Sequence, residues 1–157
     1  MDTERLDLVN AAADGRTRTF AVGDPEYRLE FTGRVLGLAS GQRSYHLPHR
    51  GGFAAPGERC GACRWTEVTI YRGSAIPGEV PDSYVVHTVG RSVVPGEVDL
   101  PKVVETASPY EVVEALTVRR QGPRGEVFMP PQHLRALAAA AQWDDGIRDA
   151  YINRAVV

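Results

Sequence analysis

Two stretches decide the fold of this chain: RWTEVTIYR at residues 64–72 and SYVVHTVGRSVV at residues 83–94. Both are rich in β-branched and aromatic residues, which favour strands, and turn-forming residues bound them. Because only a short turn-rich sequence separates them, we expect a long antiparallel hairpin. In its first strand, the expected packing residues are Trp65, Val68 and Ile70.

Three further strands are predicted from the alternation of apolar and polar residues: TRTFAV (17–22), YRLEFTGRVLGLA (27–39) and KVVET (102–106). Gly33 and Gly37 lie inside the second of these stretches, where glycine is typical of a bulge or a bend. Together with the hairpin, these stretches supply enough strands for one sheet.

A capping box predicts the first helix of the C-terminal third. Ser108 and Glu111 stand three residues apart with Pro109 between them at the first helical position, and Gly122 ends the helix. Positive charge at a helix C-terminus interacts favourably with the helix dipole, and three arginines cluster there: Arg119, Arg120 and Arg124. We therefore expect these arginines to stabilise the helix end.

Three other segments predict helices: residues 3–14, 130–143 and 144–157. The second segment is rich in alanine, which favours a helix and allows close packing. In the last segment we expect three side chains to face inward: Ile147, Tyr151 and Ile152. Its acidic residues are interpreted as helix caps: Asp144, Asp145 and Asp149.

The order of these elements indicates an α+β fold. Strands come first and helices follow, which predicts an antiparallel β-sheet with the mainly C-terminal helices packed on one face. A chain of 157 residues suits one domain, and we find no linker or internal repeat, so the domain is expected to span residues 1–157.

A Gly-, Pro- and Arg-rich segment, residues 41–63, has no usable period and is too long for an ordinary connection. It contains two pairs of metal-binding residues with the same spacing: His46 and His49, then Cys60 and Cys63. Zinc accepts imidazole and thiolate ligands in a tetrahedron. These cysteines are the only two in the chain, and in a reducing compartment they favour metal over a disulfide. We therefore predict a zinc-pinned loop between the central strands.

Four protein ligands would fill the zinc coordination shell and leave no position for water, which favours a structural role. Zinc deaminases carry a glutamate two residues after the histidine, where this chain has Gly51. Other roles stay open. If only three ligands bind, a zinc-bound water could react with Glu58 or Glu67 as the base. The cysteines could also be redox-active or unrelated to metal, although a predicted strand rather than a helix follows Cys63.

The same segment combines positive charge with aromatic residues. Residues 43–64 hold four arginines and one glutamate, a local charge of +3 in a chain of net charge −2. Such a surface can contact a phosphate backbone and stack on a base. The expected contact residues are Arg43, Arg50, Arg59, Arg64, Tyr45 and Trp65. Alternatively, the arginines only solvate the loop or pair with acids elsewhere.

The whole-chain composition narrows the function classes. With pI near 6.1, no global field draws the protein to nucleic acid or membrane. The 17 arginines against one lysine are typical of a GC-rich genome, such as that of a high-GC bacterium or a phage. Neither a signal peptide nor a membrane span is predicted, so a cytoplasmic location is expected. Motifs for nucleotide hydrolysis, dinucleotide redox chemistry, serine hydrolysis and zincin proteolysis are absent from the sequence.

The sequence therefore predicts a small accessory protein that binds a partner rather than an enzyme. Structural zinc would order the basic-aromatic loop, and nucleic acid is favoured slightly over protein as the partner. One alternative is a small zinc-dependent hydrolase or deaminase-like enzyme. Another is a metal-free inhibitor or structural protein that binds a second protein.

Overall fold

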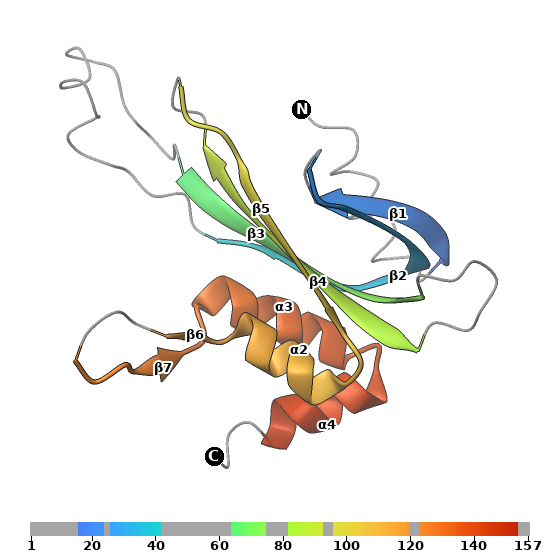
Figure 1. Ribbon diagram of the computed structural model, residues 1–157. Helices are drawn as coiled ribbons and strands as arrows, with labels where there is room; N and C mark the ends of the chain where they lie inside the picture. The colour runs from blue at the N-terminus through green and yellow to red at the C-terminus, as the bar shows by residue number, and fades with distance from the viewer. Residues whose placement is uncertain are drawn as a thin grey trace.

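A five-stranded antiparallel sheet forms the centre of the fold (Figure 1). The computed structural model describes residues 16–23, 26–41, 64–74, 82–92, 96–119 and 123–153. The strands are paired in chain order: β1 (Arg18–Gly23), β2 (Arg28–Ser40), β3 (Arg64–Ser74), β4 (Ser83–Ser92) and β5 (Leu100–Thr106). The predicted central hairpin is confirmed, with Ile70 opposite Val86 in the β3–β4 register.

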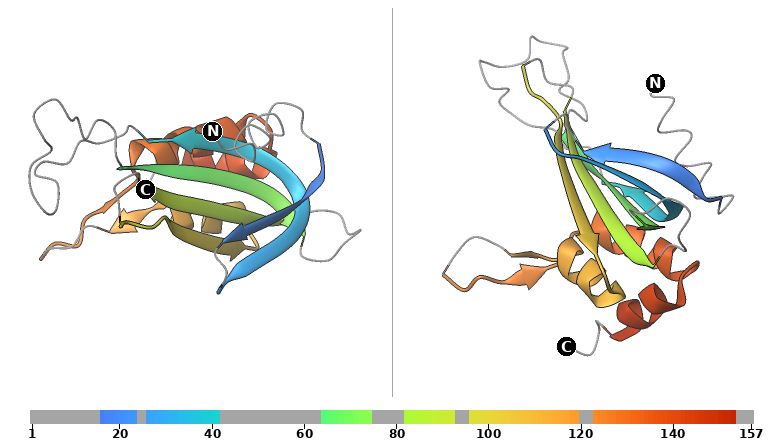
Figure 2. Two further views of the ribbon diagram at one scale, coloured as in Figure 1. Left: turned by 90° about the horizontal axis from the view of Figure 1, so that it is seen from above. Right: turned by 45° about the vertical axis from the view of Figure 1, so that its right-hand side comes forward.

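The sheet curls into a half-barrel, so that its edge strands β1 and β5 contact each other (Figure 2). We call the inner side, which faces away from the helices, the concave face. It carries an apolar cluster made of Val22, Phe31, Val35, Tyr71 and Val85. Three aromatic rings pack there, with the ring centroids of Phe31 and Tyr71 5.0 Å apart and Phe20 stacked beside them. Within the described part of the chain, the curl itself buries this side of the sheet, and the helices lie on the other side.

Three helices pack against the opposite face of the sheet, which confirms the predicted α+β arrangement. They are α2 (Pro109–Leu116), α3 (Pro131–Ala141) and α4 (Asp145–Asn153). The strands contribute side chains from alternate positions to the buried cluster: Leu36, Val68, Ile70, Tyr84 and Val86. The helices contribute chiefly Val112, Leu116, Leu137, Ala140 and Ile147. Alternation along each strand thus sends one set of apolar residues to the helices and the other to the concave face.

The predicted irregularity at Gly37 is confirmed as a bulge in β2. The β2–β3 register shifts between Val35 and Gly37, which leaves Leu36 as the extra residue. Helix α3 lies directly over this point. A Cβ atom on Gly37 would come within 2.3 Å of the Ala136 carbonyl oxygen and 3.0 Å of the Ala140 Cβ. Glycine is therefore needed here for close helix–sheet packing.

The first C-terminal helix is shorter than predicted. Thr117 has an extended backbone (φ −87°, ψ 134°) and caps α2 after Leu116. The chain then forms a two-stranded hairpin of β6 (Val118–Arg119) and β7 (Val127–Phe128). Arg119 consequently lies in a strand rather than at a helix end, and its Nη1 donates to the Gly125 carbonyl at 2.7 Å. Thr117 and Val118 are β-branched and do not favour a further helical turn, and pairing of Val118 with Phe128 fixes the strand instead.

The last helix also departs from the prediction in one side chain. Ile147 is fully buried and Tyr151 is partly buried, as expected, but Ile152 is 58% exposed.

The predicted helix at 3–14 lies outside the described residues. Among the helices that the structure describes, none is long and apolar enough to cross a membrane.

Candidate functional site

Most of the predicted site residues lie in a part of the chain that the structure does not describe. These are the predicted zinc ligands His46, His49, Cys60 and Cys63, and four predicted contact residues, Arg43, Tyr45, Arg50 and Arg59. Arg64 and Trp65 are the first two residues of β3. Across the described ranges, no three His, Cys, Asp or Glu residues lie close enough together to hold a metal ion.

The two ends of this segment are fixed on neighbouring central strands. β2 ends at Ser40, which pairs with Glu67 of β3. One residue further on, the Gly41 N–H donates to the Thr66 carbonyl at 2.7 Å. Arg135 of α3 supports the end of β2, since its Nη2 donates to the Ser40 carbonyl at 2.6 Å. Residues 42–63 therefore connect two adjacent strands at one end of the sheet, as the sequence predicts.

Trp65 lies on the concave side of β3 in a polar network. Its Nε1 donates to Glu67 Oε1 at 3.0 Å, and Arg91 Nε donates to Glu67 Oε2 at 3.2 Å. Arg91 Nη1 also donates to Asp99 Oδ2 at 2.7 Å. Burial tends to lower the pKa of Arg91, but the hydrogen bond to Asp99 and the charge of Glu67 outweigh it and raise this pKa. The network holds the Trp65 indole at the base of the segment.

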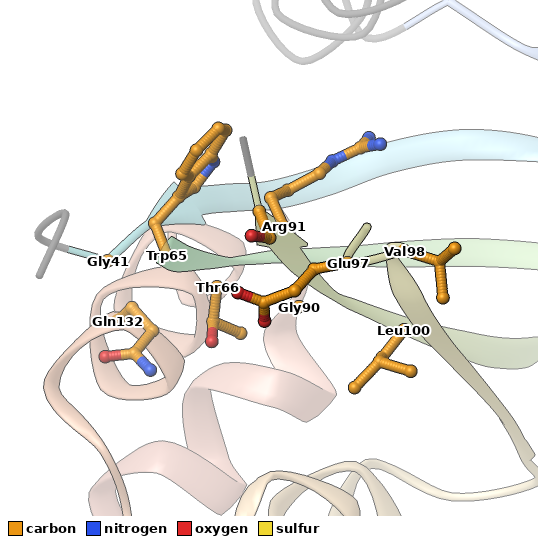
Figure 3. Close-up of a pocket in the computed structure, with 10 residues that line it drawn as sticks. Gly41, Trp65, Thr66, Gly90, Arg91, Glu97, Val98, Leu100 and Gln132 are labelled. Atoms are coloured by element: carbon orange, nitrogen blue, oxygen red, sulfur yellow. The ribbon is translucent and has the colours of Figure 1, made fainter. Parts of the chain in front are cut away.

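A shallow cavity of about 330 Å³ lies at the end of the sheet where β2 ends and β3 begins (Figure 3). Trp65 and Arg91 lie on one side of the strands, whereas Thr66 and Gln132 lie on the other. Leu100, in the wall, is 71% exposed. The described residues that line the cavity include neither cysteine nor histidine. The described lining presents hydroxyl, amide and ionic groups, including those of Thr66, Gln132 and Arg91.

His87 is the most perturbed titratable side chain near this network. It lies opposite Thr69, in the middle of β3. Its Nε2 atom is buried and has no hydrogen-bond partner among the described residues. Burial and the positive charge of Arg91 together lower the pKa of His87 to about 4, against the opposing effect of the Glu67 charge. His87 is therefore neutral in the folded protein near neutral pH.

This neutral histidine should make the stability depend on pH. Between pH 6.5 and about 4, the unfolded chain protonates His87 while the folded protein does not. We expect the free energy of unfolding to fall by about 2 kcal/mol as the pH is lowered through this window, since partial solvent contact reduces the effect. Urea denaturation of the wild type and of His87→Gln at each pH measures it. Parallel pH profiles for the two proteins would contradict the assignment.

A second polar cluster joins the sheet to the last helix. Asp144 is 4% exposed, and its Oδ1 accepts from Tyr84 Oη at 3.0 Å and from the Ile147 N–H at 2.9 Å. Its Oδ2 accepts from Arg72 Nη1 at 2.5 Å. Burial would raise the pKa of Asp144, but the hydrogen bonds from Ile147, Arg72 and Tyr84 hold it below its usual value. Burial and the nearby carboxylate raise the pKa of Tyr84 to about 12.

The sequence predicts only part of this cluster. Asp144 does cap α4, as predicted, because it accepts the Ile147 N–H. Its burial and its ion pair with Arg72 have no local signal, since 72 residues separate the two side chains. The Trp65–Glu67 contact does have a local signal in the sequence. Both residues fall on the same face when RWTEVTIYR alternates as a strand.

Comparisons with known proteins do not identify a relative. No protein-family model matches the chain, and neither a curated protein nor a solved structure does.

Proposed function

We propose that this chain is a binding protein in which a zinc ion orders residues 42–63 for contact with a partner. The ion would be held by His46, His49, Cys60 and Cys63. Contact with the partner would come from Arg43, Tyr45, Arg50, Arg59, Arg64 and Trp65. Nucleic acid is the favoured partner because residues 43–64 carry +3 in a chain of net charge −2.

The hydrogen bond between Gly41 N–H and the Thr66 carbonyl is the observation that carries this proposal. This bond holds the first and the last part of residues 42–63 next to each other, and we call these two parts the arms of the segment. His46 comes five residues after Gly41 on one arm, and Cys63 comes three residues before Thr66 on the other. The histidine pair and the cysteine pair both lie close in sequence to this hydrogen bond. They can therefore meet across the segment, as one tetrahedral zinc site requires.

The contacts of Glu67 favour binding over catalysis. A catalytic zinc site with three protein ligands would need a nearby general base, and Glu67 is one candidate from the sequence. Its carboxylate accepts hydrogen bonds from both Trp65 and Arg91, and only 13% of its side chain is exposed. A carboxylate engaged in this way acts as an anchor for Trp65.

The described charges at the end of the sheet that carries residues 42–63 indicate which side chains would contact phosphate. The described side chains there include two guanidinium groups, Arg91 and Arg135, and three carboxylates, Glu67, Glu97 and Asp99. This end of the sheet therefore offers no excess of positive charge. A phosphate backbone would have to be met by the arginines of the segment itself, which defines the variants that test the proposal.

We expect the purified protein to hold one zinc ion per chain and Cys60→Ser to lose it. Without the ion, the segment keeps its charge but loses its fixed arrangement, so affinity for nucleic acid should fall about tenfold or more. Metal analysis gives the zinc content, and fluorescence anisotropy with labelled DNA and RNA at several salt concentrations gives the affinity. His87→Gln, which lies outside the segment, is the matched control and should keep its zinc.

Two outcomes would contradict the proposal at different points. A metal-free wild-type protein would remove the zinc site. Zinc-bound protein with no salt-sensitive affinity for DNA or RNA would remove the nucleic-acid partner, since phosphate contacts always release counterions. If Cys60→Ser loses its zinc ion but binds nucleic acid as the wild type does, the metal is not needed for contact with the partner.

A further inference from the structure

The second half of β2 is an open edge of the sheet. β1 pairs with β2 only from Arg28 to Gly33, whereas β3 pairs with it as far as Ser40. Within the described part of the chain, residues 34–40 therefore have a neighbouring strand on one side only. The left view of Figure 2 shows this part of β2 (cyan) at the margin of the sheet, beside α3. An open edge of this kind is a template for a further strand.

The hydrogen bond from the Gly41 N–H to the Thr66 carbonyl indicates which backbone groups of this edge point outward. In an antiparallel ladder, residues that bond the partner strand alternate with residues that point away from it. Gly41 bonds β3, so Ser40 and Leu38 point away from β3. The Ser40 carbonyl agrees with this orientation, because it accepts from Arg135 Nη2 of α3 at 2.6 Å. Among the described residues, no partner is found for the Leu38 N–H, the Leu38 carbonyl or the Ser40 N–H.

These outward groups match a polypeptide strand. A strand offers carbonyls to the two N–H groups and an N–H to the Leu38 carbonyl, as in any ladder. Phosphate oxygens are acceptors only, so they would leave this carbonyl unpaired. The opposite edge of the sheet is less suited, because β5 contains Pro101, which has no N–H, and the exposed charge of Lys102.

The charges beside the edge favour an acidic strand. Residues 34–40 and helix α3 together contain two arginines, Arg34 and Arg135, and no carboxylate. Arg34 lies opposite Arg72 in the register, and Arg72 contacts Asp144 on the helix side of the sheet. Both cations therefore lie on the helix side, where they would face alternate residues of an added strand. A second copy of this chain would bring like charges together, which disfavours it as the partner.

We propose that a partner protein adds an extended acidic segment to β2 along residues 34–40, with carboxylates at alternate positions facing Arg34 and Arg135. Backbone hydrogen bonds to Leu38 and Ser40 would supply affinity, and the two arginines would select the charge of the partner. This contact goes beyond the function proposed above, because it needs neither the zinc ion nor nucleic acid.

A capped peptide of alternating glutamate and valine, about seven residues long, tests the proposal. Amide hydrogen exchange measured by NMR reports on the edge itself. In the free protein, the Leu38 and Ser40 amides should exchange at least about tenfold faster than the Ala39 amide, which points toward β3. Peptide at about 1 mM should slow both outward amides about tenfold or more. The same peptide with proline in place of valine cannot form a ladder and should leave them unchanged.

Three variants separate backbone pairing from charge. Ser40→Pro removes an outward N–H but no bond to β3, and it should weaken peptide binding about tenfold. R34E/R135E should bind a lysine–valine peptide more tightly than the glutamate–valine peptide, which reverses the preference of the wild type. R28E/K102E, which changes two exposed cations elsewhere, should keep the wild-type preference.

The free protein gives the first outcome that could overturn the proposal. Slow exchange of the Leu38 and Ser40 amides without peptide would mean that the edge is already occupied. Protection that rises with protein concentration would identify a second copy as the occupant, and constant protection would identify another part of this chain. Equal affinity for the glutamate and lysine peptides would overturn the acidic partner. Circular dichroism checks the fold of the variants, and the wild-type exchange data alone decide the proposal if a variant unfolds.

Discussion

Asp144→Ala should lower the free energy of unfolding by about 3 kcal/mol, because it removes a buried carboxylate that accepts several hydrogen bonds. The substitution removes one acceptor of the Arg72 guanidinium and the acceptor of the Tyr84 hydroxyl and the Ile147 N–H. It also removes the cap of α4, which packs on α2 and α3. Urea denaturation at pH 7 measures the loss.

The neighbouring carboxylate supplies the control for this prediction. The side chain of Asp145 is 93% exposed and, among the residues that the structure describes, pairs with Arg148 at 2.9 Å. Asp145→Ala should therefore cost no more than about 1 kcal/mol. A double variant, R72M/D144A, should lose less than the sum of its single variants, because both single substitutions remove the same contact between the two side chains. A loss below about 1 kcal/mol for Asp144→Ala would mean that the cluster does not hold α4 in place.

Gly37→Ala is expected to destabilise the protein by about 3 kcal/mol, near the upper end for overpacking a core. The added methyl group would lie 2.3 Å from the Ala136 carbonyl oxygen and 2.7 Å from the Ala140 backbone nitrogen. Both atoms belong to the backbone of α3, so no side-chain rotation can relieve the contact. The helix must move away from β2, which opens the cluster around Leu36. The melting temperature should fall by roughly 10 °C.

Gly90→Ala provides the matched comparison on the same face of the sheet. A Cβ atom on Gly90 would meet the Leu100 Cβ at 3.6 Å, an ordinary van der Waals contact. This variant should therefore stay within about 0.5 kcal/mol of the wild type. If both glycine variants were equally stable, α3 would not pack on the bulge as described.

The sheet is predictable from the sequence because its signals are local. The β3–β4 hairpin follows from β-branched alternation on either side of a turn, and the bulge follows from Gly37. The end of α2 is not predictable in the same way. Residues 117–120 suit either a last helical turn or a strand, and pairing of Val118 with the distant Phe128 decides between them.

In the candidate site, too, contacts within one strand are predictable from the sequence, whereas contacts between distant segments are not. The alternation of β3 places Trp65 and Glu67 on one face, so their contact could be predicted. The link from Glu67 through Arg91 to Asp99 depends on the pairing of β3 with β4 and on the path of the chain after β4. The Arg72–Asp144 pair depends on where α4 docks, which no short pattern encodes.

The order of the strands has a consequence for how this protein can vary. Each strand pairs with its neighbour in sequence, and the hydrogen bond from Gly41 to Thr66 closes the sheet before residues 42–63 begin. The free energy of closing a flexible loop rises by only about 0.6 kcal/mol for each doubling of its length. The β2–β3 connection can therefore change in length and composition while the scaffold beneath it persists. This separation makes the connection a natural insertion point for engineered sequences.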